Sequence, residues 1–168
     1  MRIYVIRHGL AGQADESRYP DDDERPLTSK GRKAFREAAR GLLSLEATPA
    51  RIFSSPALRA LQTAEILARV AGLTAKSVIP MEQLHHAARP AAALTRLARM
   101  RLPATFALVG HEPWLGEFVS LLVTGRATGG IKLAKGGACL VKAEAARPGE
   151  GVLRWLLTQE QLWSLGRR

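Results

Sequence analysis

The sequence predicts an α/β protein of three layers, in which helices cover both faces of a mostly parallel sheet. Short runs of β-branched and other apolar residues alternate with longer stretches of helical periodicity, which is typical of strand–helix–strand units. The last two apolar runs, 138–143 and 152–158, are separated by a short turn and are expected to pair as a hairpin. This hairpin would add an antiparallel edge to the sheet. The length of 168 residues fits one domain, 1–168.

Composition narrows the possible partners. The net charge of +10 attracts anions, but aromatic residues are only 5% and do not interleave with the basic ones, so nucleic-acid binding is not favoured. No signal-peptide pattern follows Met1, and no apolar stretch approaches the ~20 residues of a membrane span. We therefore expect a cytoplasmic protein with no membrane partner. The single cysteine, Cys139, excludes an internal disulfide and a cysteine metal site.

The first strand is predicted at Ile3–Ile6, a β-branched run too short for a core helix. Arg7 and His8 then lie at the carboxyl end of a strand, where open α/β sheets place ligands. Gly9 allows the backbone to turn sharply. A cation and an imidazole at this point indicate an anion site with a candidate nucleophile, and an ordinary turn is the alternative.

A polar stretch, 13–25, is predicted to be a loop over the carboxyl edge of the sheet. Its acidic run, Asp21–Glu24, lacks the alternating spacing of a calcium loop, so a solvated loop is favoured over a cation site. Pro26–Thr28 opens a helix with Thr28 as its N-cap, and Pro49 marks the exit. The core-facing residues at helical spacing are Leu27, Phe35, Ala38, Ala39, Leu42 and Leu43.

The second strand is predicted at Arg51–Ser54, followed by a helix over 57–71. Ser55 and Pro56 suit the N-cap and the first helical position. Arg59 then lies on the first helical turn, close to the strand end. Thr63 is one turn later on the same face and could orient the guanidinium. The alternative for Arg59 is a surface arginine on a basic helix.

A third strand, 75–79, is predicted after Gly72 ends the helix. The loop that follows contains Glu82, the one carboxylate of this segment and a candidate general acid, with a solvated side chain as the alternative. His85 and His86 are metal-ligand types, but neighbouring histidines are expected to point apart and no third ligand is evident. No metal site is expected.

The fourth strand is predicted at Thr105–Val109, between helices at 90–100 and 114–123. His111 follows it, at a strand's carboxyl end and a helix's amino end, where backbone N–H groups and the helix dipole favour an anion. A long loop, 124–137, leads to the hairpin, and a short helix at 159–165 ends the chain.

Strands one, two and four therefore bring two arginines and two histidines to one edge of the sheet. These are Arg7, His8, Arg59 and His111, and Glu82 is expected nearby. Guanidinium groups match phosphate oxygens bidentately. A neutral imidazole can attack phosphorus and carry the group as a phosphohistidine. The set predicts phosphoryl transfer.

Three blocks in order, Arg7–Gly9, Ser54–Ala64 and Gly110–His111, resemble the signatures of the histidine phosphatase superfamily, also called phosphoglycerate mutase-like. The match extends to about Val123, and the hairpin is consistent with it. The chain is most similar to the short phosphohistidine phosphatases of the SixA type. The small size, Arg25-Pro26-Leu27-Thr28 followed by Gly31, and His111–Gly116 carry this similarity.

The resemblance implies a phosphoglycerate mutase-like fold and a metal-independent phosphatase without a cofactor. Its substrate would be phosphohistidine on a protein, such as a histidine phosphotransfer domain. The short interval between the second and third blocks implies an open site. Alternatives are a phosphatase of small phosphate esters, such as nucleotide or sugar phosphates, and a non-catalytic phosphoprotein-binding module.

The resemblance also implies a role for each site residue. His8 would be the nucleophile, and three residues would hold the phosphoryl oxygens: Arg7, Arg59 and His111. Glu82 aligns loosely with the family's proton donor. Arg25 is a candidate substrate contact, with helix capping and loop solvation as the alternative.

Overall fold

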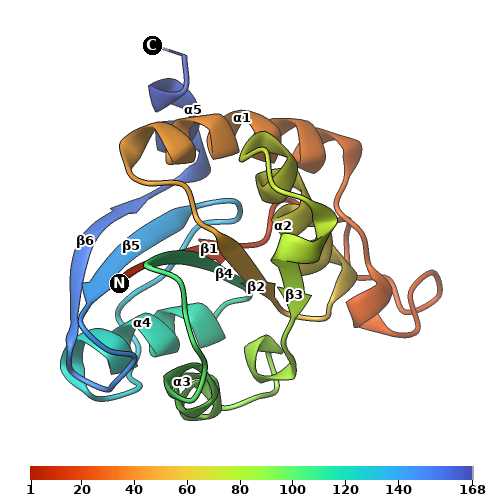
Figure 1. The fold of residues 1–168 in the computed structure, drawn as a ribbon. Coiled ribbons are helices and arrows are strands. Elements are labelled where there is room, and N and C mark those ends of the chain that lie inside the picture. Colours follow the sequence, from red (N-terminus) through yellow and green to blue (C-terminus); the bar gives the residue numbers. More distant parts are fainter. Residues whose placement is uncertain (168) are drawn as a thin grey trace.

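The computed structural model describes residues 1–167, and within them six strands form one mixed sheet (Figure 1). The strands are β1 (Arg2–Arg7), β2 (Arg51–Ser54), β3 (Val78–Pro80), β4 (Thr105–Gly110), β5 (Ala138–Ala143) and β6 (Gly151–Leu157), in the spatial order β3-β2-β4-β1-β5-β6. The first four strands are parallel, and β5 runs antiparallel to both β1 and β6. The predicted parallel sheet with an antiparallel edge is confirmed.

Helices cover both faces of this sheet, as expected for three layers. They are α1 (Ser29–Leu45), α2 (Leu58–Val70), α3 (Pro90–Ala98), α4 (Trp114–Thr124) and α5 (Gln159–Leu165). In Figure 1, α1, α2 and α5 lie on one face, and α3 and α4 on the other. Three 3-10 turns complete the connections, η1 (Asp22–Glu24), η2 (Ala75–Ser77) and η3 (Glu82–Leu84). No helix within residues 1–167 is long and apolar enough to cross a membrane.

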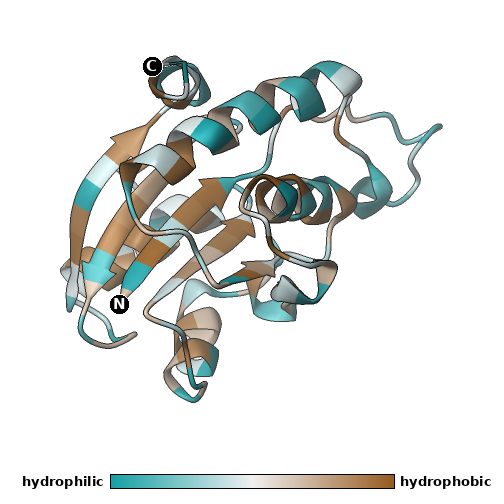
Figure 2. Cartoon of the chain, turned by 45° about the horizontal axis from the view of Figure 1, so that its top comes forward, coloured by the Kyte–Doolittle hydropathy of each residue, from teal (hydrophilic) through white to brown (hydrophobic). Residues whose placement is uncertain are grey.

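The alternation of side chains along β1 explains why two helical layers are needed. Ile3 and Val5 pack into the core beneath α3 and α4, whereas Tyr4 and Ile6 pack into the core beneath α1, α2 and α5. All four side chains are fully buried. Each such burial stabilises the fold by roughly 1.5–3 kcal/mol. The strands are correspondingly apolar on both faces, whereas α1 carries a hydrophilic outer side (Figure 2).

The strand register fixes the level at which the chain leaves the sheet. Arg7 of β1 pairs with Gly110 of β4, so His8 and His111 follow at the same level. Ser54 of β2 pairs with Val109, which places Ser55 beside the same edge. The sheet therefore aligns the ends of three strands before any side chain is considered.

Two local predictions are wrong. Helix α2 begins at Leu58 with Ala57 as its N-cap, which has no side-chain cap hydrogen bond. The Ser55 hydroxyl lies before this cap, where it accepts the Ala57 N–H at 3.4 Å and bonds to His111 Nε2. In the expected strand at 75–79, the first three residues form the 3-10 turn η2, and β3 starts only at Val78. Strand β3 is at the sheet edge and pairs with β2 alone, through three residues that end at Pro80. Proline has no N–H to extend this ladder.

Candidate active site

His8 and His111 face each other at the carboxyl edge of the sheet. Their ring centroids are 5.1 Å apart, and the rings are tilted by 53°. Both residues are buried, with 7% of His8 and 3% of His111 exposed. The structure thus brings together the two histidines that follow β1 and β4.

The proton position on His8 follows from its hydrogen bond. The Nδ1 atom lies 2.8 Å from the carbonyl oxygen of Gly9. A carbonyl only accepts hydrogen bonds, so Nδ1 carries the proton and Nε2 keeps a free lone pair. Burial lowers the pKa of His8 to about 4, and the charges of Arg59, Arg7 and Lys135 act in the same direction. A neutral imidazole with a free Nε2 is the form that attacks phosphorus.

His111 is held by a residue from another strand end. Its Nε2 lies 2.8 Å from the Ser55 Oγ. Its Nδ1 is buried and has no hydrogen-bond partner within residues 1–167. Burial lowers the pKa of His111 to about 2, with further lowering by His8 and Arg59. When the Ser55 hydroxyl donates to Nε2, the proton of the neutral ring is on Nδ1 and is available to a ligand oxygen.

Arg7 is half-buried beside these rings. Its Nη1 donates to the carbonyl oxygen of Leu133 at 2.9 Å, while its Nε finds no partner in the described part of the chain. Burial lowers the pKa of Arg7, and the Glu112 carboxylate opposes this shift. The backbone N–H of Gly136 donates to the carbonyl oxygens of Arg7 and His8. The predicted loop 124–137 therefore supports the end of β1.

Arg59 is 4% exposed, which contradicts the alternative of a surface arginine. Its Nη1 donates to the Asp22 carbonyl oxygen at 2.6 Å, and its Nη2 lies 3.1 Å from Asp22 Oδ2 and 3.9 Å from Asp23 Oδ1. The Nε has no partner among the residues described. Burial lowers the pKa of Arg59, and Asp22 is the largest opposing charge.

The acidic run was expected to be a solvated loop, and Asp22 is indeed exposed, but Asp22 and Asp23 also lie against the buried Arg59 guanidinium. Sequence reasoning missed both as site residues. The signal that could have identified them is their position in a loop predicted to lie over the carboxyl edge of the sheet, where Arg59 was also expected. A buried guanidinium needs nearby negative charge, and these two carboxylates supply it.

Arg25 lies in the same loop and binds it internally. Its Nε and Nη2 donate to the two carboxylate oxygens of Asp22 at 2.8 and 3.2 Å, and its Nη1 donates to the Gly12 carbonyl at 2.6 Å. These contacts place the Arg25 side chain within its own loop, as the alternative to a substrate contact expected. By holding Asp22, Arg25 also helps to position the carboxylate against Arg59.

Thr63 does not contact the Arg59 guanidinium, so that prediction is wrong. Its hydroxyl donates to the backbone carbonyl of Arg59 at 2.7 Å and accepts the Gly9 N–H at 3.1 Å. The i to i−4 geometry of a helix keeps the hydroxyl on its own backbone, where the turn after β1 can reach it. Thr63 thereby joins α2 to the residue after His8.

The loop after β3 places Glu82 and the two neighbouring histidines differently. Glu82 is exposed, and no hydrogen bond or ion pair joins its carboxylate to another described residue. The rings of His85 and His86 lie 4.0 Å apart, so the expectation that they point apart is wrong. Asp23 supplies a third polar group, with His85 Nε2 at 2.6 Å from its Oδ2 and His86 Nδ1 at 3.9 Å from its Oδ1.

Asp23, His85 and His86 are of the types that hold a metal ion, and their ligand atoms lie within 4.8 Å of one another. However, the Ala87 N–H donates to His85 Nδ1, so Nε2 of the neutral ring carries the proton and donates to Asp23. The Arg59 cation also lies against Asp23. The cluster is therefore joined by the His85–Asp23 hydrogen bond, while Asp23 Oδ1 has no hydrogen bond within residues 1–167.

The core of the site can bind a tetrahedral anion. Three buried nitrogens, Arg7 Nε, Arg59 Nε and His111 Nδ1, lack partners within residues 1–167. The His111 ring faces the His8 ring, and the charges of both arginines act on His8, whose Nε2 is unprotonated. Buried donors are normally satisfied, so unpaired ones indicate a missing acceptor. Phosphoryl oxygens are acceptors of the right charge.

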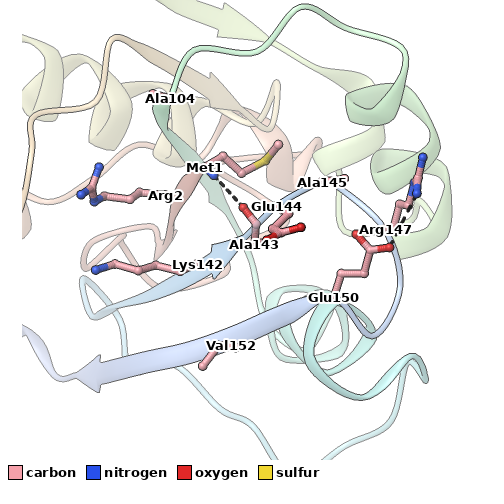
Figure 3. A pocket seen from close by; sticks show the side chains of 10 residues that line it. All are labelled: Met1, Arg2, Ala104, Lys142, Ala143, Glu144, Ala145, Arg147, Glu150 and Val152. Atoms are coloured by element: carbon pink, nitrogen blue, oxygen red, sulfur yellow. Dashed lines mark hydrogen bonds and ion pairs between the residues drawn. The ribbon is translucent and has the colours of Figure 1, made fainter.

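Surface hollows lie outside this core, two of them at opposite edges of the sheet. One, of about 630 Å³, borders Arg7 and is lined also by Glu112, Glu117 and Lys132. The other, of about 850 Å³, lies at the opposite, amino edge of the parallel strands, between Met1 and Val152 (Figure 3). In it the Met1 amino group donates to the Ala143 carbonyl, and none of the site residues reaches it. The first hollow reaches Arg7 and Glu112, the chain neighbours of His8 and His111.

Comparison with known proteins agrees with this architecture. The family model described as histidine phosphatase superfamily (branch 1) matches residues 3–86, half of the chain. An uncharacterized protein of Picosynechococcus sp. is 37% identical over 153 residues, which cover 88% of this chain and 88% of that protein.

Solved structures share the fold at lower identity. The protein histidine phosphatase SixA, in a complex with tungstate, superposes with a TM-score of 0.81 and 23% identity, covering 96% of this chain and 99% of that one. Phosphoserine phosphatase of Entamoeba histolytica, in a complex with 3-phosphoglyceric acid, gives a TM-score of 0.63 and 16% identity, covering 96% and 98%. The expected phosphoglycerate mutase-like fold is confirmed.

Proposed function

Because this chain belongs to the histidine phosphatase superfamily, we propose that it is a metal-independent phosphatase acting on phosphohistidine in proteins. His8 Nε2 attacks phosphorus, the substrate imidazole leaves, and water then releases phosphate from phospho-His8. The observation that carries the proposal is the set of three unpaired buried donors on Arg7, Arg59 and His111, together with the free Nε2 of the neighbouring His8. They would bind the phosphoryl oxygens as charge moves onto them.

The assignment of roles follows the geometry. Arg7 and Arg59 each keep Nε available while Nη1 donates to a backbone carbonyl, and Nη2 of Arg59 also contacts the Asp22 carboxylate. Fixed guanidinium groups need little reorganisation when phosphate binds. His111 donates through Nδ1, because Ser55 can satisfy its Nε2. These contacts support phosphoryl transfer over mere phosphoprotein binding, which does not need an unprotonated, buried His8.

A phosphohistidine substrate is supported by the chemistry of its leaving group. An imidazole ring of ordinary pKa is readily protonated near neutral pH and leaves without strong acid assistance. Glu82, the expected proton donor, has no partner that would hold it toward the site. Because a P–N bond does not need the carboxylic acid expected at Glu82, this substrate is compatible with the exposed, unheld Glu82 side chain.

A second candidate is a phosphatase of small phosphate esters. The hollow of about 630 Å³ beside Arg7 favours it, because it is large enough for a small organic group. Its lining carries both signs of charge, from Glu112 and Glu117 on one side and Lys132 on the other.

The test compares a phosphorylated histidine phosphotransfer domain with a panel of phosphate esters at equal concentration. We expect phosphate release from the phosphohistidine protein to be faster by about 100-fold or more, the equivalent of ~2.7 kcal/mol. A preference for an ester would overturn the substrate assignment. Full turnover by His8→Ala would overturn the mechanism, and His8→Ala that still binds the phosphoprotein is the control for a folded site.

A further inference from the structure

The loop after β3 carries a second polar cluster that borders the histidine pair and has no role in holding phosphate. It consists of Asp23, His85 and His86, from η1 and from the residues after η3. His86 is exposed, and its ring meets the buried His111 ring edge-on, with centroids 5.8 Å apart and planes at 81°. His86 therefore lies at the solvent side of the pocket.

His86 also lies close to the residues that surround Arg59. The Arg25 hydrogen bond is the main cause that lowers the pKa of Asp22, and the His86 charge adds a smaller effect in the same direction. The His86 Nδ1 is 3.9 Å from Asp23 Oδ1, the same oxygen that lies 3.9 Å from Arg59 Nη2. His86 is thus beside His111 and shares Asp23 with Arg59. Because Nδ1 faces the Asp23 carboxylate, Nε2 is the ring atom left for a substrate or a water molecule.

Asp23 is fixed from two sides. His85 Nε2–H donates to Oδ2 at 2.6 Å, and the Arg59 Nη2 lies 3.9 Å from Oδ1. His85 is itself oriented by the Ala87 N–H, which donates to its Nδ1 at 3.2 Å. A carboxylate held against an imidazole orients the ring and stabilises its protonated form. Glu82, four residues before His86 in the chain, has none of these contacts.

We propose that His86, whose Nδ1 lies 3.9 Å from Asp23 Oδ1, is the general acid and base of this site, in the place expected for Glu82. This inference rests on the proposed phosphatase function. In the first step His8 Nε2 bonds to phosphorus, the bond to the leaving nitrogen or oxygen breaks, and protonated His86 gives that atom its Nε2 proton. In the second step water attacks phospho-His8, neutral His86 takes the water proton, and the P–Nε2 bond breaks to free His8 and phosphate.

The experiment uses p-nitrophenyl phosphate, whose leaving group departs without a proton, so that the two steps separate. For His86→Ala we expect a rapid burst of nitrophenol followed by steady-state turnover about 100-fold slower than wild type, within the range for general catalysis. Phospho-His8 should accumulate, and added imidazole should restore turnover. A merely structural role would produce neither the accumulation nor the rescue.

Glu82→Gln is the matched control, because it alters the other candidate in the same loop without touching the cluster. We expect its steady-state turnover to stay within about twofold of wild type. His86→Gln, with the same assay, covers the case in which the alanine variant does not fold. Wild-type turnover of either variant of His86, or phosphoenzyme accumulation in Glu82→Gln, overturns the inference.

Two further outcomes keep the inference separate from the function. If the wild-type protein releases no phosphate from any substrate, the proposed phosphatase function itself is rejected. If the wild type is active, His8→Ala is inactive and His86→Ala is unaffected, only the role of His86 is rejected. Turnover that EDTA abolishes and Zn²⁺ restores would assign the cluster to a metal ion and overturn its acid–base role.

Discussion

The His111 ring and the Ser55 hydroxyl share a 2.8 Å hydrogen bond across 56 positions of sequence. Both groups are buried, so the bond is protected from competition with water. It joins the ends of β2 and β4, which are neighbours in the sheet. Through this bond Ser55, which the sequence suggests as a helix cap, sets the tautomer of His111 when its hydroxyl donates.

Replacing Ser55 with alanine should therefore reduce turnover. Without the hydroxyl, the proton of His111 is free to move to Nε2, and the donor for the phosphoryl group is lost in part of the population. We expect kcat to fall about tenfold, the equivalent of ~1.4 kcal/mol. Steady-state kinetics measure this change. Ser120→Ala, which alters a buried serine on α4, is the control and should keep wild-type kcat; equal losses in both variants would argue against a specific role.

Thr63 offers a second test of how α2 supports the turn after His8. In Thr63→Val the Gly9 N–H loses its acceptor in a buried place, so the free energy of unfolding should fall by about 1–3 kcal/mol. Urea denaturation measures the loss. Thr63→Ser keeps the hydroxyl and should lose much less, and a serine variant as unstable as the valine variant would show that packing of the methyl group is what matters.

The sequence alone was sufficient for the sheet because its elements are local. Two apolar runs, 3–6 and 105–109, are each followed within two residues by a polar side chain. The observed strands agree with these runs within a residue or two. Helix α1 begins after Thr28, as the capping pattern predicts, with Thr28 Oγ1 accepting the Gly31 N–H. Such features depend on neighbours within a few positions.

The missed features depend on contacts between distant segments. Asp22 and Asp23 look like a solvated run until Arg59 is placed opposite them, and Ser55 looks like a cap until His111 is placed beside it. Likewise, the direction of the His85 and His86 rings depends on Asp23, more than 60 residues earlier in the chain. No periodicity or spacing encodes these pairings.

A third prediction concerns the close approach of α1 to the loop after His8. A Cβ built at Gly31 would lie 2.1 Å from the Leu10 carbonyl oxygen, so Gly31→Ala must displace this loop or the first turn of the helix. We expect a loss of stability of about 1–3 kcal/mol, together with lower turnover, because Leu10 is two residues from His8. Thermal unfolding and kinetics measure both. Gly12→Ala adds its Cβ into open space and should change neither property; a similar loss there would discount the steric explanation.

The buried histidines predict how stability changes with pH. In the unfolded chain both imidazoles take up a proton near their ordinary pKa of 6.5, whereas in the folded protein the pKa of His8 is about 4 and that of His111 about 2. Between these limits the unfolded state binds more protons, so the free energy of unfolding is greatest above pH 6.5 and decreases as the pH falls.

From pH 6 to pH 5 we expect a loss of about 1.2 kcal/mol for each of the two histidines. Urea denaturation at the two pH values measures it. The lowered pKa of Asp22 has the same sign but acts only near and below its ordinary value of 3.8, so this window isolates the imidazoles. Since asparagine does not titrate, the double variant His8→Asn, His111→Asn should lose most of the pH dependence. An unchanged slope in that variant would mean that other groups take up the protons.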